Sequence, residues 1–234
     1  RVAIIGAGLD LGAGRRGVDM GPSAIRYAEL ESRVRDIGHD VADWGDIRSP
    51  VPEATDVGDP AARYLAPIMQ ACERVAGLVV DAADQALVPV VLGGDHSIAM
   101  GTLGGMAKAR GPGATLWIDA HGDLNRPGTS PSGNVHGMPL AAALGAAGDG
   151  FASAVFPTPS VTRAALFGIR SLDPGERELI RELDVKVVTM SEIDRHGVEK
   201  MMDEALEFLG GASFVHVSLD LDAVDPMFAP GVGT

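Results

Sequence analysis

The sequence predicts an α/β fold of three layers, with a mostly parallel sheet covered by helices on both faces. Short runs rich in Val and Ile alternate along the chain with longer segments in which apolar residues recur every three or four positions. Such alternation favours parallel strands connected by helices. The 234 residues can bury one sizeable core, and no repeat or linker interrupts them, so we expect a single domain over residues 1–234.

The predicted elements follow one another in a regular order. Val- and Ile-rich runs predict strands at residues 2–5, 88–92, 114–118, 164–169, 185–190 and 214–221. Helical spacing of apolar residues predicts helices at residues 23–37, 60–86, 97–109, 138–147, 174–182 and 191–209. A Gly-rich stretch follows the first strand, and a long polar loop follows residue 118.

Charge and composition argue against several classes of protein. The chain has 19 basic and 32 acidic residues, whereas nucleic-acid binding needs patches of Lys and Arg. Charged residues interrupt the apolar stretch at 65–92, so it predicts no membrane span. The only cysteine, Cys72, lies in an apolar helical segment and predicts a buried core residue. Without an intrachain disulfide, we expect a cytoplasmic protein.

Polar clusters follow three of the predicted strands and contain potential metal ligands. These are His96, Asp119, His121, Asp123, Asp220 and Asp222. Ligands bind beyond the carboxyl ends of strands in open parallel sheets, and residues spaced by two in an extended segment share a face. Two imidazoles and four carboxylates exceed the needs of one tetrahedral zinc and suit a pair of Mn²⁺ ions. Such a pair can lower the pKa of a bridging water.

Each short motif also has an ordinary structural explanation. A lone Asp at a strand end, such as Asp95, is usually a helix cap, and a lone buried His is usually a core residue. Two acidic runs with period two, both at strand ends, favour the metal site, because clustered carboxylates are costly without a cation. A dinucleotide site at residues 2–8 is a weaker alternative, since Gly6, Gly8 and Gly12 miss the GxGxxG spacing by one residue.

Three longer motifs resemble the metal motifs of the arginase (ureohydrolase) family in order and spacing. They are Gly93-Gly94-Asp95-His96-Ser97, Asp119-Ala120-His121-Gly122-Asp123 and the segment from Ser218 to Pro226, and the segment 16–22 fits as well. The resemblance implies an arginase-like fold with two Mn²⁺ ions. One ion would be held by His96, Asp119, Asp123 and Asp220. The other would be held by His121, Asp119, Asp220 and Asp222, with Asp119 and Asp220 bridging.

The loop at 125–140 resembles that of arginases more than that of agmatinases. The resemblance implies that the α-carboxylate of a substrate contacts Asn125, Ser130, Ser132 and Asn134. Asp173 would contact the α-ammonium group, with Glu176 nearby. His136 matches the proton-shuttling histidine of the family, and Asp123 would handle the proton that goes to the leaving amine. Hydroxyl and amide groups suit a carboxylate, and acidic groups suit an ammonium.

The resemblance therefore implies hydrolysis of L-arginine to L-ornithine and urea, by attack of a metal-bridging hydroxide on the guanidinium carbon. Agmatine, formiminoglutamate or another guanidino acid is the alternative substrate. A catalytically silent binding or scaffold protein is the alternative of another class. The family commonly forms trimers or hexamers, so we expect a homo-oligomer, with no nucleic-acid or membrane partner.

Two departures from the family pattern stand out. The family continues beyond the Asp-Pro motif into a Gly-Gly-Leu-rich strand and a glutamate that grips the guanidinium group, whereas this sequence ends at Thr234. We therefore expect the 234 residues to be part of a longer chain. Arg126 stands where the family often has Thr, which affects the expected fit of the substrate.

Overall fold

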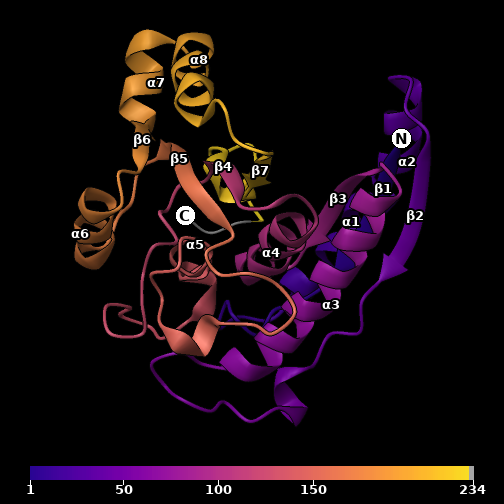
Figure 1. Cartoon of the computed structure of the whole chain (residues 1–234), viewed down its shortest axis with the longest axis horizontal. Helices are drawn as coiled ribbons and strands as arrows, with labels where there is room; N and C mark the ends of the chain where they lie inside the picture. The colour runs from indigo at the N-terminus through magenta and orange to yellow at the C-terminus, as the bar shows by residue number, and fades with distance from the viewer. Residues whose placement is uncertain (232–234) are drawn as a thin grey trace.

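The computed structural model describes residues 1–231 and confirms the predicted α/β class, with parallel strands and helices on both faces (Figure 1). Residues 232–234 of the predicted domain lie outside the described residues. The strands are β1 (Val2–Ala7), β2 (Val41–Asp46), β3 (Val88–Gly93), β4 (Gly113–Ile118), β5 (Val161–Ile169), β6 (Lys186–Thr189) and β7 (Val215–Leu219). The α-helices are α1 (Gly21–Tyr27), α2 (Leu30–Asp36), α3 (Leu65–Asp84), α4 (Ala99–Arg110), α5 (Pro139–Ala143), α6 (Pro174–Glu182), α7 (Met190–His196) and α8 (Val198–Leu209).

The strands form two parallel sheets instead of one continuous sheet. The first has the order β2-β1-β3 and the second the order β6-β5-β4-β7, and no ladder joins them within residues 1–231. In the first sheet, Gly6 of β1 pairs with Leu92 of β3. In the second, Trp117 of β4 pairs with Ser218 of β7. The carboxyl ends of β3, β4 and β7 lead into the predicted metal motifs.

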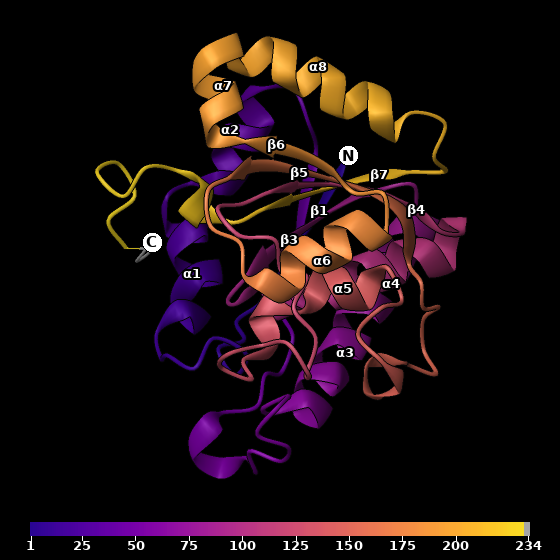
Figure 2. The same cartoon turned by 90° about the vertical axis from the view of Figure 1, so that its left-hand side faces the viewer.

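Helices cover both faces of each sheet, which gives three layers. On the four-stranded sheet, Met201, Ala205 and Leu209 of α8 pack against β4, β5 and β6. Helices α4, α5 and α6 lie on the opposite face, below the strands in Figure 2. On the three-stranded sheet, α1 and α2 cover one face and α3 covers the other. The apolar faces are thereby buried, as expected for parallel sheets.

Two predicted helices are each divided by a residue with positive φ. The helix predicted at 23–37 becomes α1 and α2, which are separated at Glu29 with a φ of 63°. The helix predicted at 191–209 becomes α7 and α8, which are separated at Gly197 with a φ of 87°. Glycine reaches this region without steric cost, so a single glycine can end one helix where the next begins.

Strand β2 is an element that the sequence pattern does not predict. It is an edge strand whose six residues alternate poorly, and it includes two aspartates and a glycine. Helix α3 begins at Leu65, whereas the apolar spacing predicts a helix from residue 60. Among the helices of residues 1–231, none is both long enough and apolar enough to cross a membrane.

Helices α3 and α4 approach closely because small residues face each other. A Cβ atom on Gly101 would lie 2.5 Å from the carbonyl oxygen of Cys72, and one on Gly105 would lie 2.8 Å from that of Ala76. Cys72 is fully buried, as predicted, and its thiol donates to the carbonyl oxygen of Ser97 at 3.3 Å. This packing fixes the start of α4, which directly follows His96–Ile98.

Replacing Gly101 with Ala should destabilise the protein by about 1–3 kcal/mol, because the new methyl group would collide with the backbone of α3. The control Gly77→Ala should stabilise it by about 0.5–1 kcal/mol, since alanine is the better helix former. Gly77 is an exposed residue of α3, and an added Cβ would meet nothing within 4 Å. Urea unfolding followed by circular dichroism measures both changes. Equal changes in the free energy of unfolding of Gly101→Ala and Gly77→Ala would contradict the close packing of α3 and α4.

Candidate metal centre

The predicted metal ligands gather where β3, β4 and β7 end. His96 opens the 3-10 helix η3 (His96–Ile98) directly after β3 and Gly94-Asp95, and the other ligands follow β4 and β7. Two groups can each bring three ligand atoms within 4.8 Å of one another: His96, Asp119 and Asp220, and Asp119, His121 and Asp222. Asp119 belongs to both groups, so two neighbouring sites would share its carboxylate.

The imidazole of His96 presents one nitrogen to carboxylates and the other to a hydroxyl. Its buried Nδ1 atom has no hydrogen-bond partner, although it lies 3.1 Å from Asp119 Oδ2, 3.0 Å from Asp123 Oδ2 and 3.4 Å from Asp220 Oδ2. Its Nε2 atom lies 2.7 Å from the hydroxyl oxygen of Ser218. In the neutral tautomer that donates from Nε2 to Ser218, the Nδ1 lone pair faces the carboxylates. A divalent cation fits this set of groups, because it would satisfy the lone pair and the negative charges together.

The imidazole of His121 completes the second group from the more open side. Its Nδ1 atom lies 3.0 Å from Asp222 Oδ2 and 3.5 Å from Asp119 Oδ1. The side chain of His121 is 35% exposed, against 8% for His96. His121 is therefore nearer to solvent than His96.

Without a cation, the carboxylates hold protons in the site. Burial opposes the charged form of His96, but the adjacent carboxylates raise its pKa well above the ordinary value. Asp119 and Asp222 raise the pKa of His121 to about 10. Burial and the charge of Asp119 raise the pKa of Asp123. A bound cation would replace these protons, because metal ligands must be deprotonated.

Backbone N–H groups fix the carboxylates in place. The N–H of His121 donates to Asp119 Oδ1 at 2.7 Å, and that of Asp222 donates to Asp220 Oδ1 at 2.9 Å. The N–H of Ala120 donates to Asp222 Oδ1 at 3.1 Å. In Asp119 and Asp220 the other oxygen, Oδ2, faces His96 Nδ1, at 3.1 Å and 3.4 Å, where a cation could also reach it.

Asp123 has an unusual backbone conformation, with a φ of 51°. Its carbonyl oxygen accepts from Leu140 N at 3.1 Å and from Ala141 N at 3.3 Å, at the start of α5. A positive φ is uncommon in residues other than glycine and often marks a functional position. Here the first turn of α5 stabilises the conformation that directs the Asp123 side chain toward His96.

Asp95 is a cap residue, as the structural alternative held. Its Oδ1 atom accepts from Ser97 N at 3.0 Å and from the Ser97 hydroxyl, and its Oδ2 atom accepts from Gly12 N at 2.8 Å. A Cβ atom on Gly12 would lie 2.6 Å from Ser97 Oγ, and one on Gly94 would lie 1.9 Å from the carbonyl oxygen of Leu9. The close approach at Gly12 accounts for this glycine of the segment after β1 without a dinucleotide.

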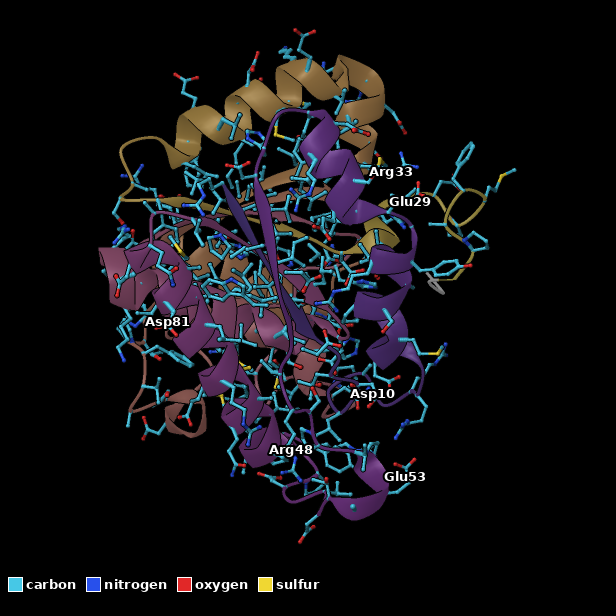
Figure 3. All side chains as sticks on the ribbon, turned by 90° about the vertical axis from the view of Figure 1, so that its right-hand side faces the viewer. Asp10, Glu29, Arg33, Arg48, Glu53 and Asp81 are labelled. Carbon is cyan, nitrogen blue, oxygen red and sulfur yellow. The ribbon has the colours of Figure 1, made fainter. Side chains whose placement is uncertain are left out.

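A cluster of ion pairs around Arg16 stabilises the later part of the segment that follows β1. Arg16 Nε lies 3.0 Å from the buried Asp10 carboxylate, and Arg16 Nη1 lies 2.7 Å from Glu53 Oε2. Figure 3 shows Asp10 and Glu53 in the same region of the molecule. Segment 16–22, which resembles the corresponding segment of the family, thus begins with Arg16, and this residue links the loops that contain Asp10 and Glu53.

The predicted substrate residues Asn125, Asp173 and Glu176 meet at the start of α6. Asn125 Nδ2 donates to Asp173 Oδ2 at 2.8 Å, and the hydroxyl of Thr129 donates to Asn125 Oδ1 at 3.1 Å. Glu176 is buried and accepts from the backbone N–H groups of Leu124 at 3.0 Å and Asp173 at 2.8 Å. Both Glu176 oxygens are thus used to hold the two loops together.

The other three predicted substrate residues contact their own loop or the segment after β1. Gly133 N donates to Ser130 Oγ at 3.0 Å, and Asn134 N donates to Ser132 Oγ at 3.2 Å. Asn134 Nδ2 donates to the carbonyl oxygen of Ala13 at 3.4 Å. In these bonds both serine hydroxyls act as acceptors, which leaves their hydrogens to donate to a ligand.

His136 lies half-buried in the 3-10 helix η4 (Val135–Gly137). Its backbone N–H donates to the carbonyl oxygen of Gly12 at 3.3 Å. Burial lowers the pKa of its imidazole, while the charges of Asp95 and Asp220 act in the opposite direction. The imidazole is therefore mainly neutral at neutral pH and can accept a proton.

Two contacts of the site escape prediction from the sequence, namely those made by Trp117 and Ser218. The rings of Trp117 and His96 are stacked, with centroids 4.1 Å apart, and Trp117 Nε1 donates to Asp119 Oδ2 at 3.1 Å. Trp117 and Ser218 each precede an aspartate by two residues in a strand, which places them on the same face as that aspartate. This spacing is a signal that the sequence contains.

Binding of Mn²⁺ to the metal-free protein at pH 7 should release protons, and its apparent affinity should rise with pH. His121 has a pKa of about 10 without the metal, so it is protonated below that pH and must lose its proton on binding. For each proton released, lowering the pH by one unit should weaken binding up to about tenfold. Calorimetry in buffers of different ionisation enthalpy counts these protons. His121→Asn should release fewer protons and the exposed His196→Asn the same number; binding without proton release would contradict the assignment.

Comparison with known proteins agrees with this geometry. The arginase family pattern matches residues 1–234. An arginase of Bacillus subtilis (strain 168) is 47% identical over 235 residues, which cover 100% of this chain and 79% of the relative. The structure of the Bacillus caldovelox arginase has a TM-score of 0.94 at 46% identity, covering 100% of this chain and 79% of that one. The structure of the Bacillus cereus arginase has a TM-score of 0.91 at 46% identity, and the match covers 100% of this chain and 78% of that one. The chain therefore belongs to the arginase family.

Proposed function

We propose that the protein hydrolyses L-arginine to L-ornithine and urea with two Mn²⁺ ions. The observation that carries this proposal is the pair of ligand groups that share Asp119, in a chain that is 46–47% identical to arginases over its full length. When bound, the ion pair would supply a water of lowered pKa that attacks the guanidinium carbon. The choice of Mn²⁺ rests on the donor set, which is rich in carboxylates, has some imidazole and has no thiolate.

We assign six residues to the ions, as the family resemblance implies: His96, Asp119, His121, Asp123, Asp220 and Asp222. The contacts of His96 with Asp123 and Asp220 support the first ligand set. The contact of His121 with Asp222 supports the second. Asp119 and Asp220 would bridge the ions.

The amino-acid end of the substrate would lie against the 125–136 loop and the start of α6. Asp173 would bind the α-ammonium group, and Asn125, Ser130, Ser132 and Asn134 would donate to the α-carboxylate. The hydrogen bond between Asn125 and Asp173 supports this arrangement, because it places an amide donor beside an anionic acceptor. Glu176 would act mainly by holding Leu124 and Asp173 in position.

Two residues would move protons during the reaction. Asp123 is buried, and its Oδ2 atom lies 3.0 Å from His96 Nδ1, so its carboxylate would be close enough to the ions to take up a proton and pass it to the leaving amine. His136 would carry protons between the site and solvent, since it is half-buried and its pKa is lowered by burial.

Urea release from the Mn²⁺-loaded protein should be detected with L-arginine and not with agmatine, which has no carboxylate for the 125–136 loop. A colorimetric urea assay with both substrates side by side measures this. Turnover of agmatine alone would overturn the substrate assignment while keeping the metal chemistry. No turnover of any guanidino compound would favour a binding or scaffold role.

Asp119→Ala should remove both metal ions and abolish urea release, because this carboxylate belongs to both ligand groups. The matched control is Asp225→Ala, an exposed carboxylate in the segment after β7, which should keep two ions and full activity. Metal content after desalting, measured by mass spectrometry, separates the two variants. Retention of two tightly bound ions by Asp119→Ala would exclude its bridging role.

We also propose a cytoplasmic location and a homo-oligomer, a trimer or hexamer as in the family. The only cysteine is buried and unpaired, which suits a reducing compartment. Light scattering combined with size-exclusion chromatography gives the mass in solution.

A further inference from the structure

The metal-ligand groups differ in how they depend on the two sheets. His96 follows β3 of the three-stranded sheet, whereas its partners Asp119 and Asp220 follow strands of the four-stranded sheet. The group of Asp119, His121 and Asp222 comes from the four-stranded sheet alone. No ladder joins the sheets within residues 1–231, so side-chain contacts must place His96 against its partners.

Apart from the carboxylates, Trp117 and Ser218 contact the imidazole of His96 from the four-stranded sheet. Trp117 is fully buried, and its ring lies parallel to that of His96 within 14°, at a centroid distance of 4.1 Å. Ser218 Oγ lies 2.7 Å from His96 Nε2. Trp117 and Ser218 pair across β4 and β7, so the two contacts come from adjacent positions of one ladder. The ring plane and the orientation of His96 are thus both fixed.

Trp117 also contacts the carboxylate that the two ligand groups share. Its Nε1–H donates to Asp119 Oδ2 at 3.1 Å, and this is the oxygen that lies 3.1 Å from His96 Nδ1. The other oxygen, Oδ1, accepts from the backbone N–H of His121 and lies 3.5 Å from its Nδ1 atom. The indole therefore acts on the half of the carboxylate that faces His96.

We propose that Trp117 is a positioning residue that shapes the His96 ligand group selectively, through the stack on His96 and the hydrogen bond to Asp119 Oδ2. This inference rests on the proposed pair of Mn²⁺ ions and adds that one of the two sites depends on Trp117. Ser218 acts on the same site, because its hydroxyl contacts His96 Nε2 at 2.7 Å and so orients the ring that presents Nδ1 to the carboxylates. The His121 group shares Asp119, but His121 faces the other oxygen of that carboxylate, Oδ1, which accepts from the backbone N–H of His121 and not from Trp117.

The test is Mn²⁺ binding to the metal-free chain, measured by calorimetry and by electron paramagnetic resonance of free Mn²⁺. Trp117→Phe keeps an aromatic ring and removes the N–H, and it should weaken one of two sites by about 10–100-fold and leave the other unchanged. Ser218→Ala should weaken the same site. The matched control Trp44→Phe changes the other tryptophan, which packs against the core from β2, and should bind like the wild type.

To identify which of the two metal sites is weakened, His121→Asn is added to Trp117→Phe and to Trp44→Phe. With Trp117→Phe, this double variant should retain no tightly bound ion, whereas with Trp44→Phe it should retain one. In the Trp44→Phe protein, Mn²⁺ should also quench the emission of Trp117, the only indole left. Circular dichroism of the metal-free variants checks folding, and Ser218→Ala decides the question if Trp117→Phe unfolds.

Three outcomes of the Mn²⁺ titrations would overturn the inference. Wild-type affinities at both sites in Trp117→Phe and Ser218→Ala, or equal losses at both sites, would show that these residues do not act on the His96 group selectively. A wild-type chain that binds fewer than two ions would instead refute the proposed two-metal function, and the inference with it. The wild-type titration therefore distinguishes the two failures.

Discussion

Repulsion among closely spaced carboxylates is the interaction on which the rest of the site depends. Asp119, Asp123 and Asp222 are buried, and Asp220 lies beside them against His96. Buried negative charges need compensation inside the protein. Burial and the charge of Asp119 raise the pKa of Asp123, and the carboxylates raise the pKa values of both imidazoles, so protons on these three groups supply this compensation in the metal-free site. The site is thus suited to exchanging protons for divalent cations.

The fold concentrates these charges by ending three parallel strands at one place. The close approach of α3 and α4 fixes the chain that follows His96, and the ladder between β4 and β7 fixes the carboxylates on the other side. Backbone N–H groups hold one oxygen of Asp119, Asp220 and Asp222, and the other oxygen of Asp119 and of Asp220 faces His96. The same carboxylates therefore serve two purposes. Each accepts a hydrogen bond that stabilises the loop, and each is also a candidate metal ligand.

The segment after β1 connects the metal centre with the loop that would recognise the substrate. Gly12 donates to Asp95 and accepts from His136, and Ala13 accepts from Asn134. A ligand that moves the 125–136 loop would therefore also act on residues next to His96.

The sequence by itself determined the parallel α/β class and the metal motifs, because period-two acidic runs at strand ends are local patterns. It also contained the spacing that places Trp117 and Ser218 on the face of Asp119 and Asp220. Only the tertiary structure decided that the strands form two ladders, that Glu29 interrupts a predicted helix, and that His96 stacks on Trp117. These features arise between segments far apart in the chain or from a strained backbone, and neither cause leaves a periodic signal in the sequence.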